Sequence, residues 1–366
     1  MEIGLFMMPT HPPERSPIEG ARWDLQMIRW ADELGFAEAW IGEHFTAIWE
    51  PVPAPDLLIA QALLQTSRIK LAPGAHLLPY HHPAELAARV AYLDHLAQGR
   101  FMFGVGSSGL PSDWQLFNVD GAAGENRRMT AEALDIILRI WDAEGEMRYE
   151  GQYWTVHVPP PMVDGLLYHH LKPLQKPHPP IGIAGLSPRS DTLKLAGERG
   201  FIPMSLNLSP HYIATHWEVY EEAARAAGRE PNRATWRIVR EVFVGETDAE
   251  ARRWCLEGNM GRQEREYLLP LFRAFDFAQW MTADPNVSAA DLTPEYFVDH
   301  GWLVGSVETV AEKLLEMHRQ VGGFGTLLVL GFDYADAPGP WRQSMELLAR
   351  EVLPRVNRAL EPVPMG

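Results

Sequence analysis

His44 is the side chain of this sequence best suited to move a proton near neutral pH. Histidine titrates near 6.5, so it can act as a general acid or a general base under ordinary conditions. His44 and Glu43 directly follow the apolar segment 37–41, which predicts a strand that ends at these two residues. We expect His44 to be catalytic and Glu43 to orient it. The plain alternatives are a hydrogen-bonded structural histidine and a strand-end hydrogen bond.

Three more histidines, at positions 76, 81 and 82, follow another apolar segment. Such a group can bind a metal ion when further ligands have suitable spacing. The sequence has no His-Glu-x-x-His pattern, and Pro79 and Pro83 make the segment rigid and loop-like. We therefore expect no metal, and expect these histidines to line a pocket or the surface.

The segment Gly185-Leu186-Ser187-Pro188-Arg189-Ser190 has the composition of an anion site. It follows an apolar segment, and Pro188 suits the first position of a helix. Backbone N–H groups at a helix start, with the hydroxyls of Ser187 and Ser190, can hold a phosphate. Arg128 would supply a matching cation. Ordinary helix capping and a solvated arginine are the alternatives.

Residues 104–109 spell G-x-G-x-x-G, the dinucleotide-binding pattern. That function requires a helix that opens at the third glycine and binds the pyrophosphate. Pro111 falls where the periodicity of that helix would begin. The small residues fit a flexible strand-end loop equally well, or a backbone that a flat ligand ring can approach.

Eight apolar segments alternate with helical patterns along the chain, which favours a parallel sheet. With eight helices this alternation predicts an α/β (β/α)₈ TIM barrel, in which all strands end at one mouth where the chemistry occurs. We expect one domain over residues 1–366, with insertions at about 107–126, 157–180 and 257–300. The predicted strands are 2–8, 37–41, 69–75, 101–106, 181–184, 201–206, 236–244 and 326–331.

Composition excludes several classes of protein. Of the 366 residues, 46% are hydrophobic and 22% are charged, as in ordinary globular proteins. The net charge of −16 disfavours nucleic acid and anionic membranes as partners. One cysteine, Cys255, allows no internal disulfide. Without a long apolar run or signal-peptide features, we expect a cytoplasmic protein.

Several motifs in order along the chain resemble the bacterial luciferase-like flavin monooxygenases. They are Trp40-Ile41-Gly42-Glu43-His44-Phe45, 73–79, 82–83, 98–106, 196–200 and 303–310. Residues 48–51, 72–79 and 340–341 look most like the diketocamphane and limonene monooxygenase branch.

This resemblance implies a dimeric barrel that binds reduced FMN, delivered by a separate NAD(P)H:flavin reductase. It implies a catalytic role for His44 and a non-prolyl cis peptide at 74–75 beneath the flavin ring. The residues that it places at the cofactor are Gly74, Ala75, Gly106, Ser107, Arg128, Gly185, Leu186, Ser187 and Ser190. Gly106 stands where luciferases have a reactive cysteine, which argues against light emission. Ser107 replaces a phosphate-binding arginine, so Arg128, Ser187 and Ser190 would carry more of the phosphate binding.

The activity implied is activation of O₂ as a C4a-peroxyflavin, followed by oxygenation of a medium-sized apolar substrate. The reaction would be Baeyer–Villiger oxidation of a ketone, or hydroxylation or epoxidation of a terpenoid or aromatic polyketide. We expect Trp49, His76 and Trp114 to line the substrate pocket, because aromatic side chains line apolar sites. A deazaflavin-dependent hydride-transfer enzyme and a flavin-binding protein without turnover remain alternatives. A homodimer is expected through Leu57, Leu58, Leu86 and Val90.

Overall fold

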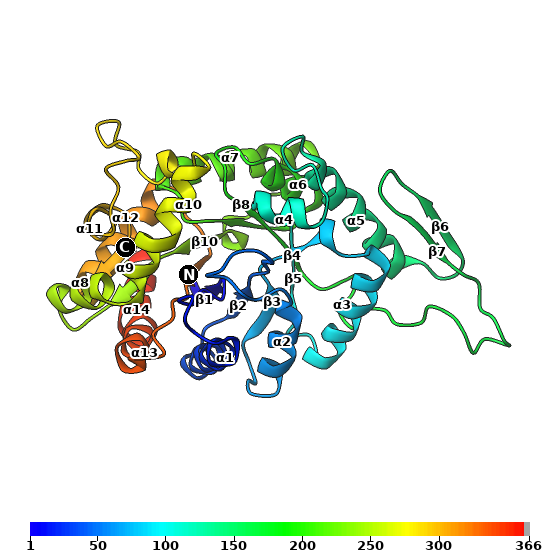
Figure 1. Cartoon of the computed structure of the whole chain (residues 1–366), viewed down its shortest axis with the longest axis horizontal. Coiled ribbons are helices and arrows are strands. Elements are labelled where there is room, and N and C mark those ends of the chain that lie inside the picture. Colours follow the sequence, from blue (N-terminus) through cyan, green and yellow to red (C-terminus); the bar gives the residue numbers. More distant parts are fainter. Residues whose placement is uncertain (362–366) are drawn as a thin grey trace, which may run out of the picture.

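A closed barrel of parallel strands forms the centre of the protein, and helices surround it (Figure 1). The computed structural model describes residues 1–361. Within them the barrel has eight staves: β1 (Glu2–Met7), β2 (Glu38–Ile41), β3 (Lys70–Pro73), β5 (Phe103–Gly106), β8 (Ile181–Gly185), β9 (Ile202–Ser205), β10 (Arg237–Arg240) and β13 (Thr326–Leu330). β1 pairs with both β2 and β13, and the bridge between Leu71 and Phe101 links β3 to the start of β5, which closes the ring. The predicted (β/α)₈ barrel is confirmed.

Two strands depart from simple staves. After Gly74-Ala75, β4 (His76–Leu77) continues β3 but pairs with β5. The predicted strand 236–244 is interrupted at Glu241, and its second half, β11 (Val242–Val244), leaves the barrel to pair with β12 (Leu303–Gly305). The bottom of the barrel is filled, so the mouth at the carboxyl ends of the strands is left for chemistry.

Large and small residues alternate inside the barrel. The Trp40 ring fills space left by glycines: a Cβ built on Gly182 would lie 2.5 Å from that ring, and one on Gly104 would lie 3.0 Å away. Below Trp40, Glu38 forms an ion pair with Arg237 at 3.0 Å. This packing explains Gly104, the first glycine of the 104–109 segment, without a dinucleotide.

The helices start at signals that the sequence shows. For α1, Ser16 and Glu19 form a capping box, and Gly35 ends the helix in the left-handed conformation. The helices that cover the barrel are α1 (Pro17–Leu34), α2 (Pro55–Leu63), α3 (Pro83–Ala97), α5 (Glu125–Asp142), α6 (Asp191–Arg199), α7 (Pro210–Ala226), α8 (Asp248–Glu257), α12 (Val307–Gln320), α13 (Pro338–Leu347) and α14 (Leu353–Leu360). A π-helical turn, η5 (Leu348–Val352), joins the last two, and short 3₁₀ turns are η1 (Leu78–Tyr80), η2 (Arg233–Thr235) and η4 (Ala278–Trp280).

The segments expected as insertions contain short elements that periodicity does not reveal. Residues 107–126 include α4 (Pro111–Leu116). The hairpin β6 (Met147–Glu150) and β7 (Thr155–Val158), with the loop after it, extends away from the barrel (Figure 1). Residues 257–300 form α9 (Asn259–Gln263), the π-helical turn η3 (Glu264–Leu268), α10 (Leu269–Ala274) and α11 (Pro294–His300). The last residues of the expected domain, 362–366, lie outside the described part.

Two surface expectations can be compared with the structure. Of the four residues expected at a dimer interface, Leu58, Leu86 and Val90 are buried in the barrel's own core, and only Leu57 is exposed. That expectation was wrong for these three, because the apolar face of a barrel helix packs on the barrel first. Across residues 1–361, no helix combines the length and apolar character needed to cross a bilayer.

Candidate active site

His44 lies at the mouth between two carboxylates from different segments. Its Nδ1 is 3.2 Å from Asp113 on α4, and its Nε2 is 3.2 Å from Glu50 in the loop after β2. Burial alone would lower the pKa of His44, but the charges of Glu50 and Asp113 outweigh burial and raise it. The imidazole is thus placed to hold a second proton.

Glu43 does not orient His44, contrary to the expectation from their adjacency. Its carboxylate lies 2.9 Å from His76 Nδ1 and 2.7 Å from His81 Nε2. Glu43 and His44 both lie beyond Ile41, the last residue of β2, and their side chains reach different partners. Burial would raise the pKa of Glu43, but these two histidines lower it to about 2.

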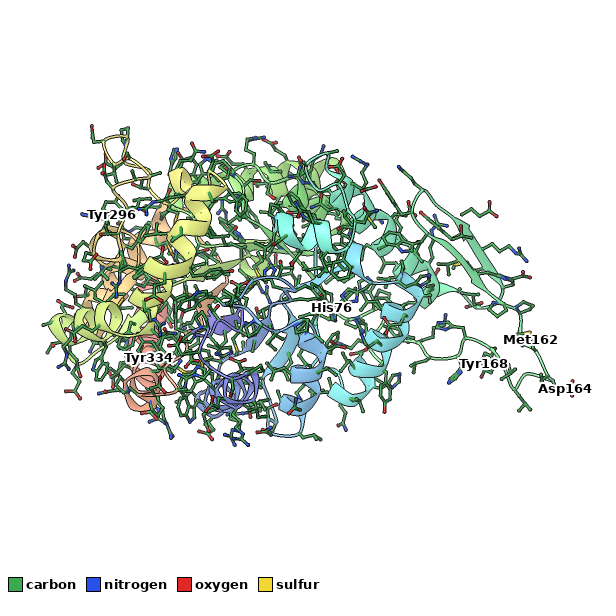
Figure 2. The ribbon with its side chains drawn as sticks, in the orientation of Figure 1. His76, Met162, Asp164, Tyr168, Tyr296 and Tyr334 are labelled. Atoms are coloured by element: carbon green, nitrogen blue, oxygen red, sulfur yellow. The ribbon has the colours of Figure 1, made fainter. Side chains whose placement is uncertain are left out.

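His76 also lies elsewhere than expected. Its side chain is fully buried and packs against Phe103, which in turn contacts Trp141 on α5. Its side chain therefore lies between the barrel and the helices around it, and does not line a substrate pocket. Figure 2 shows His76 near the middle of the view. With Glu43 and His81 it fixes the backbone that follows Gly74-Ala75.

Glu43, His76 and His81 are the described group whose geometry most resembles a metal site. Their ligand atoms lie within 4.8 Å of one another. Arg89 can only donate, and it lies 3.2 Å from His81 Nδ1. The ring proton of neutral His81 must then be on Nε2, pointing at Glu43. Because a metal would need that nitrogen unprotonated, we interpret the group as a hydrogen-bond network.

The expected ring-binding residues lie together at the ends of neighbouring strands. The Gly74-Ala75 peptide is cis, and a Cβ built on Gly106 would lie 3.2 Å from the Ala75 Cβ. Asn126 donates to the carbonyls of Ser107 and Ser108, both at 3.0 Å, and so fixes the loop. The Ser107 hydroxyl is buried and has no protein partner. A polar ligand group at this position would satisfy it.

The turn at 185–190 is held by a histidine that the sequence did not single out. His216 on α7 lies 2.8 Å from the Ser187 carbonyl through Nε2 and 2.9 Å from the Ser205 hydroxyl through Nδ1. Burial lowers the pKa of His216 to about 4, so its ring is neutral and Nε2–H donates to Ser187. Ser190 caps α6, and its hydroxyl lies 2.8 Å from that of Thr192.

The two arginines at the start of α5, Arg127 and Arg128, contact different segments of the chain. Arg128 donates to the Tyr153 hydroxyl at 3.0 Å and to the Ala123 carbonyl at 2.9 Å. Its neighbour Arg127 reaches Asp191, the first residue of α6, at 3.7 Å. The start of α5 therefore faces the turn before α6, and Arg127 joins Arg128 as a candidate cation for a phosphate there.

The two remaining substrate candidates differ in exposure. Trp49 is 4% exposed and stacks on Tyr267 of η3, with ring centres 5.9 Å apart. Trp114 on α4 is half-buried, its indole N–H lacks a protein partner, and Gly121 leaves room for its ring. Trp114 stays a candidate for substrate contact. Trp49 does not, because its ring is buried against Tyr267.

A cavity of about 790 Å³ opens beside the ends of β9 and β10, separate from His44. Asn207, Leu208 and Glu241 line it on the barrel side, and Met281 and Phe297 line it on the side of the 257–300 segment.

The comparisons with known proteins agree with this geometry. Residues 1–323 match the model of the luciferase-like monooxygenases. The chain belongs to this family. It is 37% identical to 3,6-diketocamphane 1,6-monooxygenase of Pseudomonas putida, over 97% of this chain and 98% of the relative. It is 31% identical to limonene 1,2-monooxygenase of Rhodococcus erythropolis, over 99% and 88%.

A solved structure extends this likeness to three dimensions. The oxygenating constituent of 3,6-diketocamphane monooxygenase from Pseudomonas putida, a type II Baeyer–Villiger enzyme in complex with FMN, superposes with a TM-score of 0.91. It is 38% identical, over 97% of this chain and 98% of that chain. The family membership and the closer likeness to the diketocamphane and limonene branch, both expected from the motifs, are confirmed.

Proposed function

We propose that this protein is the oxygenase component of a two-component flavin monooxygenase. It uses FMNH₂ from a separate NAD(P)H:flavin reductase, and O₂, to convert a medium-sized apolar ketone to an ester or lactone. The observation that carries this proposal is the full-length likeness, in sequence and fold, to the FMN-bound Baeyer–Villiger enzyme.

The residues present fit FMN. The small residues Gly106 and Ala75 lie side by side near the unpartnered Ser107 hydroxyl, so a ring with polar edges can approach the backbone there. The Gly185–Ser190 turn, the start of α6 and the arginines at 127 and 128 suit the phosphate. When bound, reduced flavin supplies the electrons that activate oxygen.

The chain itself contributes proton control. His44 lies at the mouth, 14% exposed, and is the proton donor and acceptor of the site. Asp113 fixes the Nδ1–H of His44, as a carboxylate does for a catalytic histidine. Trp114 supplies apolar surface that favours an apolar substrate over water.

Epoxidation or hydroxylation is the second candidate, because the limonene monooxygenase is also similar over nearly the whole chain. The products of a ketone and an alkene separate the two reactions.

We also propose a cytoplasmic homodimer, whose candidate contact residues are the exposed Leu57, Leu64 and Tyr92 on or beside α2 and α3. Sedimentation at micromolar concentration tests that: a monomer would contradict it.

The test of the cofactor is turnover of a bicyclic ketone with reduced FMN and, in parallel, with a reduced deazaflavin. Lactone formed with FMN alone supports the proposal. Ketone reduced to alcohol by the deazaflavin would overturn it in favour of hydride transfer. Tight flavin binding without product from a panel of ketones and alkenes would favour a binding protein.

A further inference from the structure

A second carboxylate on the catalytic histidine distinguishes this site from a simple histidine–aspartate pair. Asp113 occupies His44 Nδ1, and Glu50 lies 3.2 Å from Nε2, the nitrogen that the pair would leave free. The side chain of Glu50 is 8% exposed. A buried carboxylate is costly unless it is partnered, so its position at Nε2 needs a reason.

The 257–300 segment supplies a partner for Glu50. Tyr267 lies close enough to Glu50 for its hydroxyl to lower the pKa of that carboxyl, and its ring stacks on Trp49, the residue before Glu50. Tyr267 lies in the π-helical turn η3, a distortion often found at functional sites. The turn thus fixes both the backbone and the carboxylate at this position.

Three carboxylates act on His44: Asp113 on α4, Glu50 in the loop after β2, and Glu43 two residues beyond the end of β2. The neutral Tyr267 hydroxyl on η3 acts on Glu50. Thr46 donates to Asp113 from the same loop as Glu50. Arg262, a cation near this group, lies over Trp49, 5.6 Å from its ring centre, and is paired with the exposed Glu14 and Glu266. His44 therefore faces negative charge on both ring nitrogens.

We propose that Glu50 is a positioning residue that keeps a second proton on His44, and that Tyr267 keeps Glu50 ionised and in place. Asp113 accepts from Nδ1–H, and the Glu50 carboxylate forms an ion pair 3.2 Å from Nε2, so His44 rests as an imidazolium. When His44 passes the Nε2 proton to a bound substrate, the ring becomes neutral and its Nδ1–H remains hydrogen-bonded to Asp113. The use of that proton in oxygenation rests on the proposed function, whereas the protonation state does not.

Tyr267 has a defined electrostatic role in this arrangement. Burial raises the pKa of Glu50, so an isolated Glu50 would compete with His44 for the shared proton. The Tyr267 hydroxyl opposes this rise and so favours the proton on the imidazole. Loss of the Glu50 carboxylate or of the Tyr267 hydroxyl therefore lowers the pKa of His44 in both cases.

The test is hydrogen–deuterium exchange at the imidazole Cε1–H, followed for each histidine by mass spectrometry across pH, in the full chain without flavin. We expect Glu50→Gln to move the His44 midpoint to lower pH by at least about one unit, which is tenfold in proton affinity. Tyr267→Phe moves it less, in the same direction. Glu266→Gln, the same change at an exposed neighbour of Tyr267, leaves it in place.

A His44 midpoint that is the same in the wild type and Glu50→Gln overturns the inference. Tyr267→Phe keeps the carboxylate and tests the same network if Glu50→Gln does not fold; an unchanged midpoint in that variant overturns the role of Tyr267. In the active enzyme, the same shift is expected in the pH profile of kcat. Because the exchange measurement needs no flavin or substrate, its failure is distinct from a failure to oxygenate.

Discussion

His44 shows how far a single residue can be interpreted from its chain neighbours. Its chemistry and its place at a strand end were predictable, because a barrel brings the carboxyl ends of its strands to one mouth. Its partners were not. Asp113 lies 69 residues away in a six-residue helix, and the adjacent Glu43 points to other histidines.

At this scale we predict that His44→Asn lowers kcat by a factor of about 10² to 10⁴ at saturating reduced FMN, as loss of a general acid–base does. Flavin affinity should change little, since the expected phosphate contacts lie at another strand. The measurement is product formation in single turnover. His157→Asn, on the exposed hairpin strand β7, is the matched control. A native rate in His44→Asn would refute the assignment.

Among the elements, the turn between β8 and α6 depends on close packing. A Cβ on Gly185 would lie 2.7 Å from Leu193 and 3.0 Å from Ser190, so only glycine lets α6 start this near the strand. Ser190 and the N-terminus of α6 are in place because of this contact. His216 holds the other side through the Ser187 carbonyl.

We predict that Gly185→Ala weakens FMN binding about tenfold or more, equivalent to about 1.4 kcal/mol. The added methyl group displaces Leu193 or the turn, and overpacking of this kind costs about 1–3 kcal/mol of stability. Fluorescence titration of FMN measures the first effect and urea unfolding the second. Gly145→Ala, where nothing lies within 4 Å of the added carbon, should change neither. Equal behaviour of the two variants would contradict the prediction.

The elements also show which parts of the fold a sequence reveals. All eight staves and the helices between them were predictable, because buried strands and amphipathic helices leave clear periodicity. Short elements such as α4 and η3 leave none, yet they deliver Asp113 and Tyr267 to His44 and Glu50. The anion turn was predictable as a turn, but His216 beneath it was not, since burial of one histidine among 14 has no local signal.

The first and last strands of the barrel, β1 and β13, lie side by side, and a cluster of charged side chains lies just after their ends. His11, just after β1, lies 2.9 Å from Asp333, just after β13, and 3.2 Å from Asp24 on α1. Arg15 adds a 2.9 Å contact to Asp333. Burial would lower the pKa of His11, but Asp24 and Asp333 raise it to about 9.

This gives a pH dependence of stability with a definite sign. An unfolded histidine titrates near 6.5, so between pH 6.5 and 9 the folded state binds the extra proton. The stabilisation is complete below pH 6.5 and is lost as the pH rises through 9. We expect the free energy of unfolding to fall by about 2–3 kcal/mol over that range.

Urea unfolding at pH 6.5 and 9 measures this fall. His11→Asn should reduce this pH-dependent fall in the free energy of unfolding, whatever its effect on the absolute stability. His157→Asn should leave the fall unchanged. An equal fall in all three proteins would show that groups other than His11 cause it.

This barrel is proposed to insert one atom of O₂ into an apolar substrate. The most direct measurement is turnover of a bicyclic ketone under ¹⁸O₂, with FMNH₂ supplied by a separate reductase and the product analysed by mass spectrometry. We predict a lactone that carries one ¹⁸O atom in the wild type and in His157→Asn, and much less in His44→Asn. Flavin reoxidation with all the ¹⁸O in free hydrogen peroxide, with every ketone and alkene tried, would contradict the account.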